Sequence, residues 1–207
     1  MRLFRLFLIL VICASCKQTV VNKGDDTLSY NVESEEFTNS SCMTEDTIIV
    51  LKDIAKCDSL ISLEKDNNML FMLYQQKVNL LTRIGKARDA YFEQGKAMEL
   101  LPKEDVRRLE YEAIGAYLQQ DLNRYSQLLN KAINECKKEP YDAAMILNQA
   151  TFYTLLDNDE ASKAVMENYL KDNDDEAISY AYEDYPHFKK QILEGRTTLI
   201  KLLQTED

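Results

Sequence analysis

The chain has 207 residues, 35 acidic and 25 basic side chains, and a formal net charge of −10. Binding to nucleic acid or to anionic lipid needs clustered Lys and Arg, so this composition argues against both functions. One histidine and five cysteines without metal-ligand spacing exclude a histidine-rich zinc site and give no disulfide framework.

The first residues have the layout of a secretory signal. Arg2 and Arg5 form a short cationic start, and residues 6–12 form an apolar run. The run is too short to span a bilayer as a stable helix. We therefore interpret residues 1–15 as a signal peptide.

A cysteine preceded by two small residues ends this segment, in the sequence Ala14-Ser15-Cys16. It resembles the lipobox of bacterial lipoproteins, although Cys13 stands where that family usually has leucine. The resemblance implies cleavage before Cys16 and acylation, palmitate included, of its thiol and new amino group. Two or three acyl chains anchor a protein durably, whereas one holds it only marginally. A cut before Cys13 would put Ile12 where signal peptidases need a small residue.

The same resemblance suggests where the mature protein resides. Lys17 follows the cysteine, and an aspartate there would have implied retention at an inner membrane. We therefore expect attachment to a bacterial outer membrane, facing the periplasm. Loss of Arg2 and Arg5 with the signal makes the mature chain more acidic, with a charge of −12.

Residues 16–43 contain few large apolar side chains, so they cannot bury enough surface to offset the entropy cost of ordering. We expect them to form a lipidated, flexible tether. Thr44 has the character of a helix N-cap, with Glu45 and Asp46 in the first turn. The sequence thus predicts a folded domain over residues 44–207.

This domain lacks the alternation of apolar and polar residues that is typical of strands, so we expect an all-α fold. Its prolines fall between segments of helical periodicity, where a helix can begin but an interior would be broken. Together with further turn-forming residues, they divide the domain into successive helical hairpins. The predicted breaks are Gly85, Pro102, Asp121, Pro140, Asp157-Asn158 and Pro186.

Residues 84–102 resemble the second half of a tetratricopeptide repeat. Such a repeat has a glycine at its turn, two alanines in its second helix and a closing proline, and Gly85, Ala90, Ala97 and Pro102 stand at the matching offsets. The resemblance implies an α-solenoid of stacked hairpins, because small residues let paired helices approach closely. A non-repetitive helical bundle is the alternative.

Two weaker units follow. The second carries Leu109, Ala113 and Ala116 before a turn at residues 120–122, but Tyr125 stands where its first small residue should be. The third covers residues 141–173 and aligns only if its turn holds one or two extra residues.

The C-terminal segment, residues 174–207, has the pattern of an end piece. An array of hairpins needs a capping helix to cover its last apolar face. An apolar stripe at helical spacing supplies one, formed by Phe188, Ile192, Leu199 and Leu203. Tyr180, Tyr182 and Tyr185 are a possible aromatic recognition patch, although packing at the edge of the core is commoner for such residues.

Catalytic patterns are scarce. His187 could serve as a base for Cys136 or for a serine, but it lies in an acidic, tyrosine-rich stretch that favours a surface position. Cys57 and Cys136 are expected to be small buried residues, and Cys42 a surface thiol. We expect no enzyme activity, no cofactor and no metal.

If the repeat resemblance holds, function lies in the groove lined by the first helices of the hairpins. The groove positions would be Gln75, Asn79 and Arg83 in the first unit and Glu110 and Tyr117 in the second. Long polar side chains on a rigid face suit the capture of an extended peptide. We expect an adaptor or scaffold for an exported protein or peptide. A surface lipoprotein that binds a small molecule or glycan is the alternative.

Overall fold

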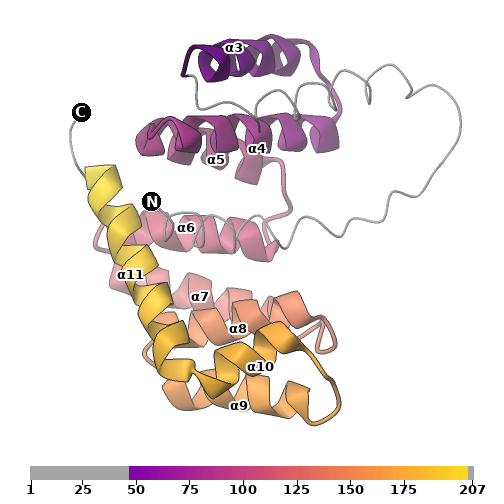
Figure 1. The fold of residues 1–207 in the computed structure, drawn as a ribbon, viewed down its shortest axis with the longest axis vertical. Helices are drawn as coiled ribbons and strands as arrows, with labels where there is room; N and C mark the ends of the chain where they lie inside the picture. The colour runs from indigo at the N-terminus through magenta and orange to yellow at the C-terminus, as the bar shows by residue number, and fades with distance from the viewer. Residues whose placement is uncertain (1–46, 205–207) are drawn as a thin grey trace, which may run out of the picture. The chain divides into compact units, whose positions relative to one another are not determined.

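The structure is a computed structural model that describes residues 47–204. Between these residues the chain forms helices joined by short connections and contains no strand (Figure 1). The predicted all-α fold class is therefore confirmed for this part of the chain. The predicted signal peptide, Cys16, the tether, Cys42 and the cap at Thr44 lie outside the described residues.

The helices fall into two compact units that divide between Leu101 and Pro102. The first contains α3 (Thr47–Leu63), α4 (Asn67–Arg83) and α5 (Ala87–Glu99), with α4 packed against both of the others. Its α3–α4 contact is built on Val50, Cys57 and Leu80, which are fully buried.

Within residues 102–204, the second unit contains six helices. They are α6 (Val106–Leu118), α7 (Leu122–Cys136), α8 (Ala143–Leu155), α9 (Asp159–Leu170), α10 (Glu176–Glu183) and α11 (Tyr185–Gln204). Helices adjacent in sequence pack together from α6 through α11, and α11 also packs against α8 (Figure 1). One core cluster is shared by α6, α7, α8 and Ile192 of α11, and a second by α8, α9, α10 and Tyr185 of α11.

The three hairpins α4–α5, α6–α7 and α8–α9 turn in the same way. The middle residue of each turn has positive φ: 79° at Gly85, 61° at Gln120 and 57° at Asp157. The backbone N–H of the next residue then donates a hydrogen bond to a carbonyl in the last turns of the first helix. These bonds run from Lys86 to Leu81, from Asp121 to Ala116 and from Asn158 to Tyr153, each at 2.9 Å. This left-handed C-cap satisfies carbonyls that the helix end leaves free. The described part of the chain therefore contains the same hairpin geometry three times.

The third turn needs no extra residues, contrary to the alignment made from the sequence. All three connections have three residues. The turns lie 35 and then 37 residues apart because α7 has 15 residues where α5 has 13. The additional residues lengthen a helix and leave the turn unchanged.

Small residues line the helix contacts, as the repeat pattern predicts. Ala90 and Ala97 of α5 are buried, and so are Ala113 and Ala116 of α6. In α9 the fully buried small residue is Ser162, whereas Ala164 is exposed.

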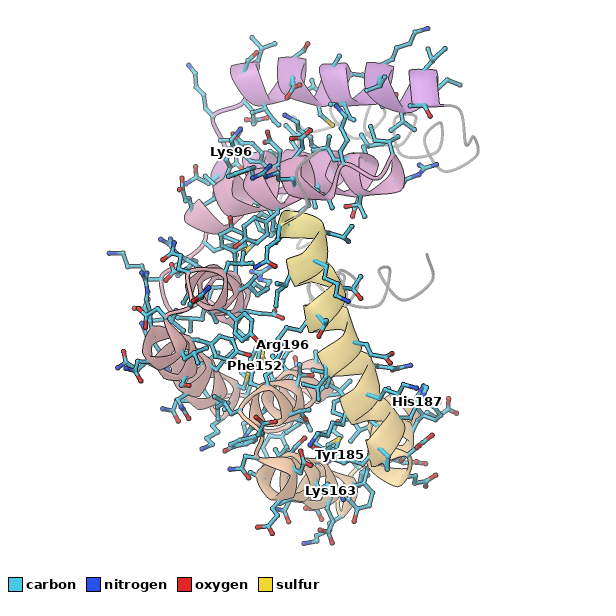
Figure 2. The ribbon with its side chains drawn as sticks, turned by 90° about the vertical axis from the view of Figure 1, so that its left-hand side faces the viewer. Lys96, Phe152, Lys163, Tyr185, His187 and Arg196 are labelled. Atoms are coloured by element: carbon cyan, nitrogen blue, oxygen red, sulfur yellow. The ribbon has the colours of Figure 1, made fainter. Side chains whose placement is uncertain are left out.

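The C-terminal helix begins at Tyr185 with Pro186 as its second residue, where the missing proline N–H costs no hydrogen bond. Its predicted apolar stripe faces the hairpins: Ile192 and Leu199 are buried, and Phe188 packs against both core clusters. In Figure 2, Tyr185 and Arg196 extend from α11 toward the hairpins, whereas His187 points away from them.

Candidate ligand site at the second hairpin

Counting from the repeated turn shows where the second hairpin differs from its neighbours. Three residues before the positive-φ residue, α4 and α8 carry Thr82 and Thr154, whereas α6 carries Tyr117. Five residues after it, α5 and α9 carry Ala90 and Ser162, whereas α7 carries Tyr125. The second hairpin thus has a pair of aromatic side chains where the other two have small ones.

In the third hairpin the small pair binds the start of α11. The Thr154 hydroxyl lies 3.0 Å from the Ser162 hydroxyl and 3.0 Å from the Tyr185 hydroxyl, and all three side chains are buried. Tyr185 also donates to Asp159 at 3.1 Å, and Lys189 forms an ion pair with the same carboxylate at 2.6 Å. These bonds fix the first half of α11 on α8 and α9.

In the second hairpin the aromatic pair binds a residue three turns further along α11. The Tyr117 and Tyr125 rings meet edge to face, with centroids 5.1 Å apart. The guanidinium carbon of Arg196 lies 5.1 Å from the Tyr117 ring centroid, within cation–π range. One guanidinium nitrogen donates to the Tyr125 hydroxyl at 3.3 Å.

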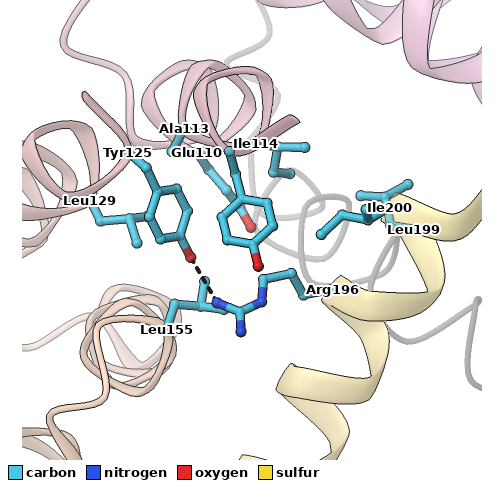
Figure 3. Close-up of a pocket in the computed structure, with 10 residues that line it drawn as sticks. Glu110, Ala113, Ile114, Tyr125, Leu129, Leu155, Arg196, Leu199 and Ile200 are labelled. Carbon is cyan, nitrogen blue, oxygen red and sulfur yellow. Dashed lines mark hydrogen bonds between the residues drawn. The ribbon is translucent and has the colours of Figure 1, made fainter. Parts of the chain in front are cut away.

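A pocket opens where these side chains meet α6, α7 and α8 (Figure 3). Its free volume is about 20 Å³, close to the space of one water molecule. Arg196 is its cation and Glu110 its carboxylate. The remaining lining residues are Ala113, Ile114, Tyr117, Tyr125, Leu129, Leu155, Leu199 and Ile200.

Burial shifts two titratable groups of this pocket. It raises the pKa of the half-buried Glu110 carboxyl from 4.5 to about 7. No ion pair or hydrogen bond to another described residue offsets this effect. Burial also raises the pKa of the Tyr125 phenol, which the hydrogen bond from Arg196 opposes. Tyr125 is therefore neutral at physiological pH and keeps a proton to donate.

The structure brings together two of the five predicted groove residues, Glu110 and Tyr117, which both line this pocket. The other three lie on α4 of the first unit. There Gln75 donates to Gln94 of α5 at 3.1 Å, Asn79 is half-buried and Arg83 is exposed. The sequence pattern did not predict Arg196 or Tyr125 as site residues. The departure of Tyr125 from the repeat pattern was a signal of this site.

Among the described residues, the His187 side chain interacts with neither Cys136 nor a serine. His187 is exposed, lies beside Gln191 at 2.7 Å and meets the exposed Tyr180 edge to face. Cys136 is fully buried, and burial raises its pKa to about 12, so it remains a thiol. No interaction between these two side chains is found in the described part of the chain.

The expected burial of Cys57 and Cys136 is confirmed, and burial raises the pKa of Cys57 to about 12 as well. Tyr185 of the suggested aromatic patch is buried with its hydroxyl bonded, so it packs in the core.

Residues 47–204 contain no group of three or more His, Cys, Asp or Glu side chains placed to hold a metal ion. None of the helices in this range combines the length and hydropathy of a membrane span.

Comparison with known proteins identifies no relative: no family model, no curated protein and no solved structure matches the chain.

Proposed function

We propose that the chain is a lipid-anchored scaffold of a bacterial cell envelope, which binds an exported protein or peptide and has no catalysis of its own. The observation that carries this proposal is the threefold repetition of one hairpin geometry, with its left-handed turns at Gly85, Gln120 and Asp157. Repeated hairpins of this kind present their first helices as rigid surfaces, which suit the recognition of extended chains.

The docking surface in this proposal includes the α4 residues Gln75, Asn79 and Arg83. They are spaced four residues apart, so they follow one line along the helix. Gln75 is held in place by its bond to Gln94, and Asn79 and Arg83 are the residues that we choose to test. An amide and a guanidinium can pair with the backbone groups and acidic side chains of a bound peptide.

The test is an affinity purification from membranes with Asn79→Ala combined with Arg83→Glu. The matched control is Asn68→Ala with Arg88→Glu, which makes the same changes at exposed positions outside the predicted surface. We expect a partner that the wild type and the control recover equally and that the test variant loses, at unchanged helical circular dichroism. Equal recovery by both variants would rule out this surface.

The anchor has its own test, in mass spectrometry of the mature amino terminus. The proposal requires a first residue Cys16 that carries acyl chains. An unmodified Cys16 or an intact Met1 would remove the lipid anchor from the proposal and leave the docking surface untouched.

A further inference from the structure

We propose that the pocket at the second hairpin binds a small molecule with one carboxylate on an apolar body, held by Arg196 and the hydroxyls of Tyr117 and Tyr125. This inference goes beyond the scaffold function and does not rest on it, because no partner protein takes part.

The unused hydrogen-bond donors and the charge of Arg196 support this proposal. A guanidinium has five N–H donors, and the structure shows one of them bonded, to Tyr125. No carboxylate of the described residues pairs with Arg196, in a chain with 35 acidic side chains. Removing a charge from water is costly unless a partner compensates it. A half-buried arginine that pairs with no carboxylate of the described residues is therefore suited to bind an anion.

The geometry around Arg196 favours a planar acceptor. The Tyr117 ring lies against the guanidinium and Tyr125 accepts one N–H, so the remaining donors stay along its edge. A carboxylate matches such an edge with two parallel hydrogen bonds. The neutral Tyr125 phenol still has its proton to donate, and the Tyr117 hydroxyl bonds to no described residue.

The charge of the pocket limits the ligand to one negative charge. Arg196 is the only Lys or Arg among the residues that line it, and Glu110 is the only acid, which becomes charged as the pH rises through about 7, its raised pKa. A phosphate group of charge near −2 would exceed what this single cation balances, and the net charge of −10 would repel it further. A monocarboxylate is neutralised by one guanidinium.

The size of the pocket and its apolar lining determine the rest of the ligand's structure. The free volume of about 20 Å³, little more than that of one water molecule, leaves room for the two carboxylate oxygens and not for the rest of the ligand. The half-buried Ile114 of α6 and Ile200 of α11 line the pocket as well, together with the buried Leu199. An alkyl chain attached to the carboxylate would cover these side chains and remove their apolar surface from water.

The experiment is calorimetric titration of octanoate into the full chain, with acetate and octan-1-ol as matched ligands that lack the apolar body or the charge. We expect octanoate to bind at one site, and each matched ligand to bind at least tenfold more weakly. Equal binding of acetate would reveal a plain anion site, and equal binding of octan-1-ol a plain apolar site. Either result would overturn the proposal, as would no binding of octanoate.

Variants then test the named groups. Arg196→Gln should weaken octanoate binding at least tenfold, whereas Arg124→Gln, the same change at an exposed residue of α7, should leave it unchanged. Should Arg196→Gln lose helical circular dichroism, Tyr125→Phe keeps the ring and removes only the hydroxyl, and we expect it to weaken binding about threefold. Full affinity in a folded Arg196→Gln chain, or in Tyr125→Phe, would contradict the assignment.

Discussion

The Lys77 ammonium of α4 lies 2.9 Å from the Glu93 carboxylate of α5, and both side chains are only 12% exposed. The same ammonium reaches Asp58 of α3 at 2.5 Å. Burial alone would lower the pKa of Lys77, but its hydrogen bonds to Asp58 and Glu93 outweigh burial and raise it. One cation therefore joins all three helices of the first unit.

Replacing Lys77 by Met should destabilise the chain by about 1–3 kcal/mol, because Glu93 would stay buried with only the exposed Lys96 as its partner. Lys86→Met is the control, since its ion pair with Asp89 is exposed on both sides and should contribute less than about 0.5 kcal/mol. Urea denaturation followed by circular dichroism measures both. Equal midpoints for the two variants would show that the buried ion pair does not stabilise the unit.

The raised pKa of the Glu110 carboxyl predicts that the free energy of unfolding decreases as the pH rises. Its pKa is raised to about 7 in the folded chain from 4.5, so between these values the folded state binds more protons than the unfolded state. Stability then decreases from about pH 4.5 upward and levels off above pH 7, by on the order of 2–3 kcal/mol in total.

The check is Glu110→Gln, compared with the wild type at pH 5 and pH 8 by urea denaturation. The nearby groups are Tyr117 on the same helix, Tyr125 and Cys136 on α7 and Arg196 on α11. Burial raises the pKa values of the Tyr125 phenol and the Cys136 thiol, so both groups stay protonated over this range. We expect the variant to be more stable than the wild type at pH 8 and about equal at pH 5. A constant difference at both pH values would refute the assignment to Glu110.

The hairpins could be predicted from the sequence because their signals are local. Gly85 and Asp157-Asn158 mark turns through their own backbone preferences, and Ala90 and Ala97 mark a close helix contact. The site could be predicted only in part. Tyr125 showed a departure from the repeat, but its partner Arg196 lies 71 residues away, and no pattern of spacing records such a contact.

The positive-φ turns give a pair of opposite predictions. Gln120 at φ 61° carries a side chain in a conformation that favours glycine, so Gln120→Gly should stabilise the chain by about 0.5–1 kcal/mol. Gly85→Ala should destabilise it by about 1 kcal/mol, through backbone strain alone, because an added Cβ would meet no atom within 4 Å. Thermal unfolding measures both shifts. If both variants shift the midpoint in the same direction, the two turns are not equivalent.

The repeat also supplies a matched test of the buried hydroxyls. Thr154 bonds to Ser162, to Tyr185 and to the Ala150 carbonyl, with no exposed surface of its own. The equivalent Thr82 bonds only to the Val78 carbonyl of its own helix. Thr154→Val should cost about 1–3 kcal/mol, because it removes a shared partner from two buried hydroxyls, whereas Thr82→Val should cost less than about 0.5 kcal/mol. Hydrogen exchange of the α11 amides should also accelerate in Thr154→Val, since the Tyr185 bond that holds the start of this helix is lost. Similar losses in both variants would mean that the substitution itself, and not the link to α11, sets the effect.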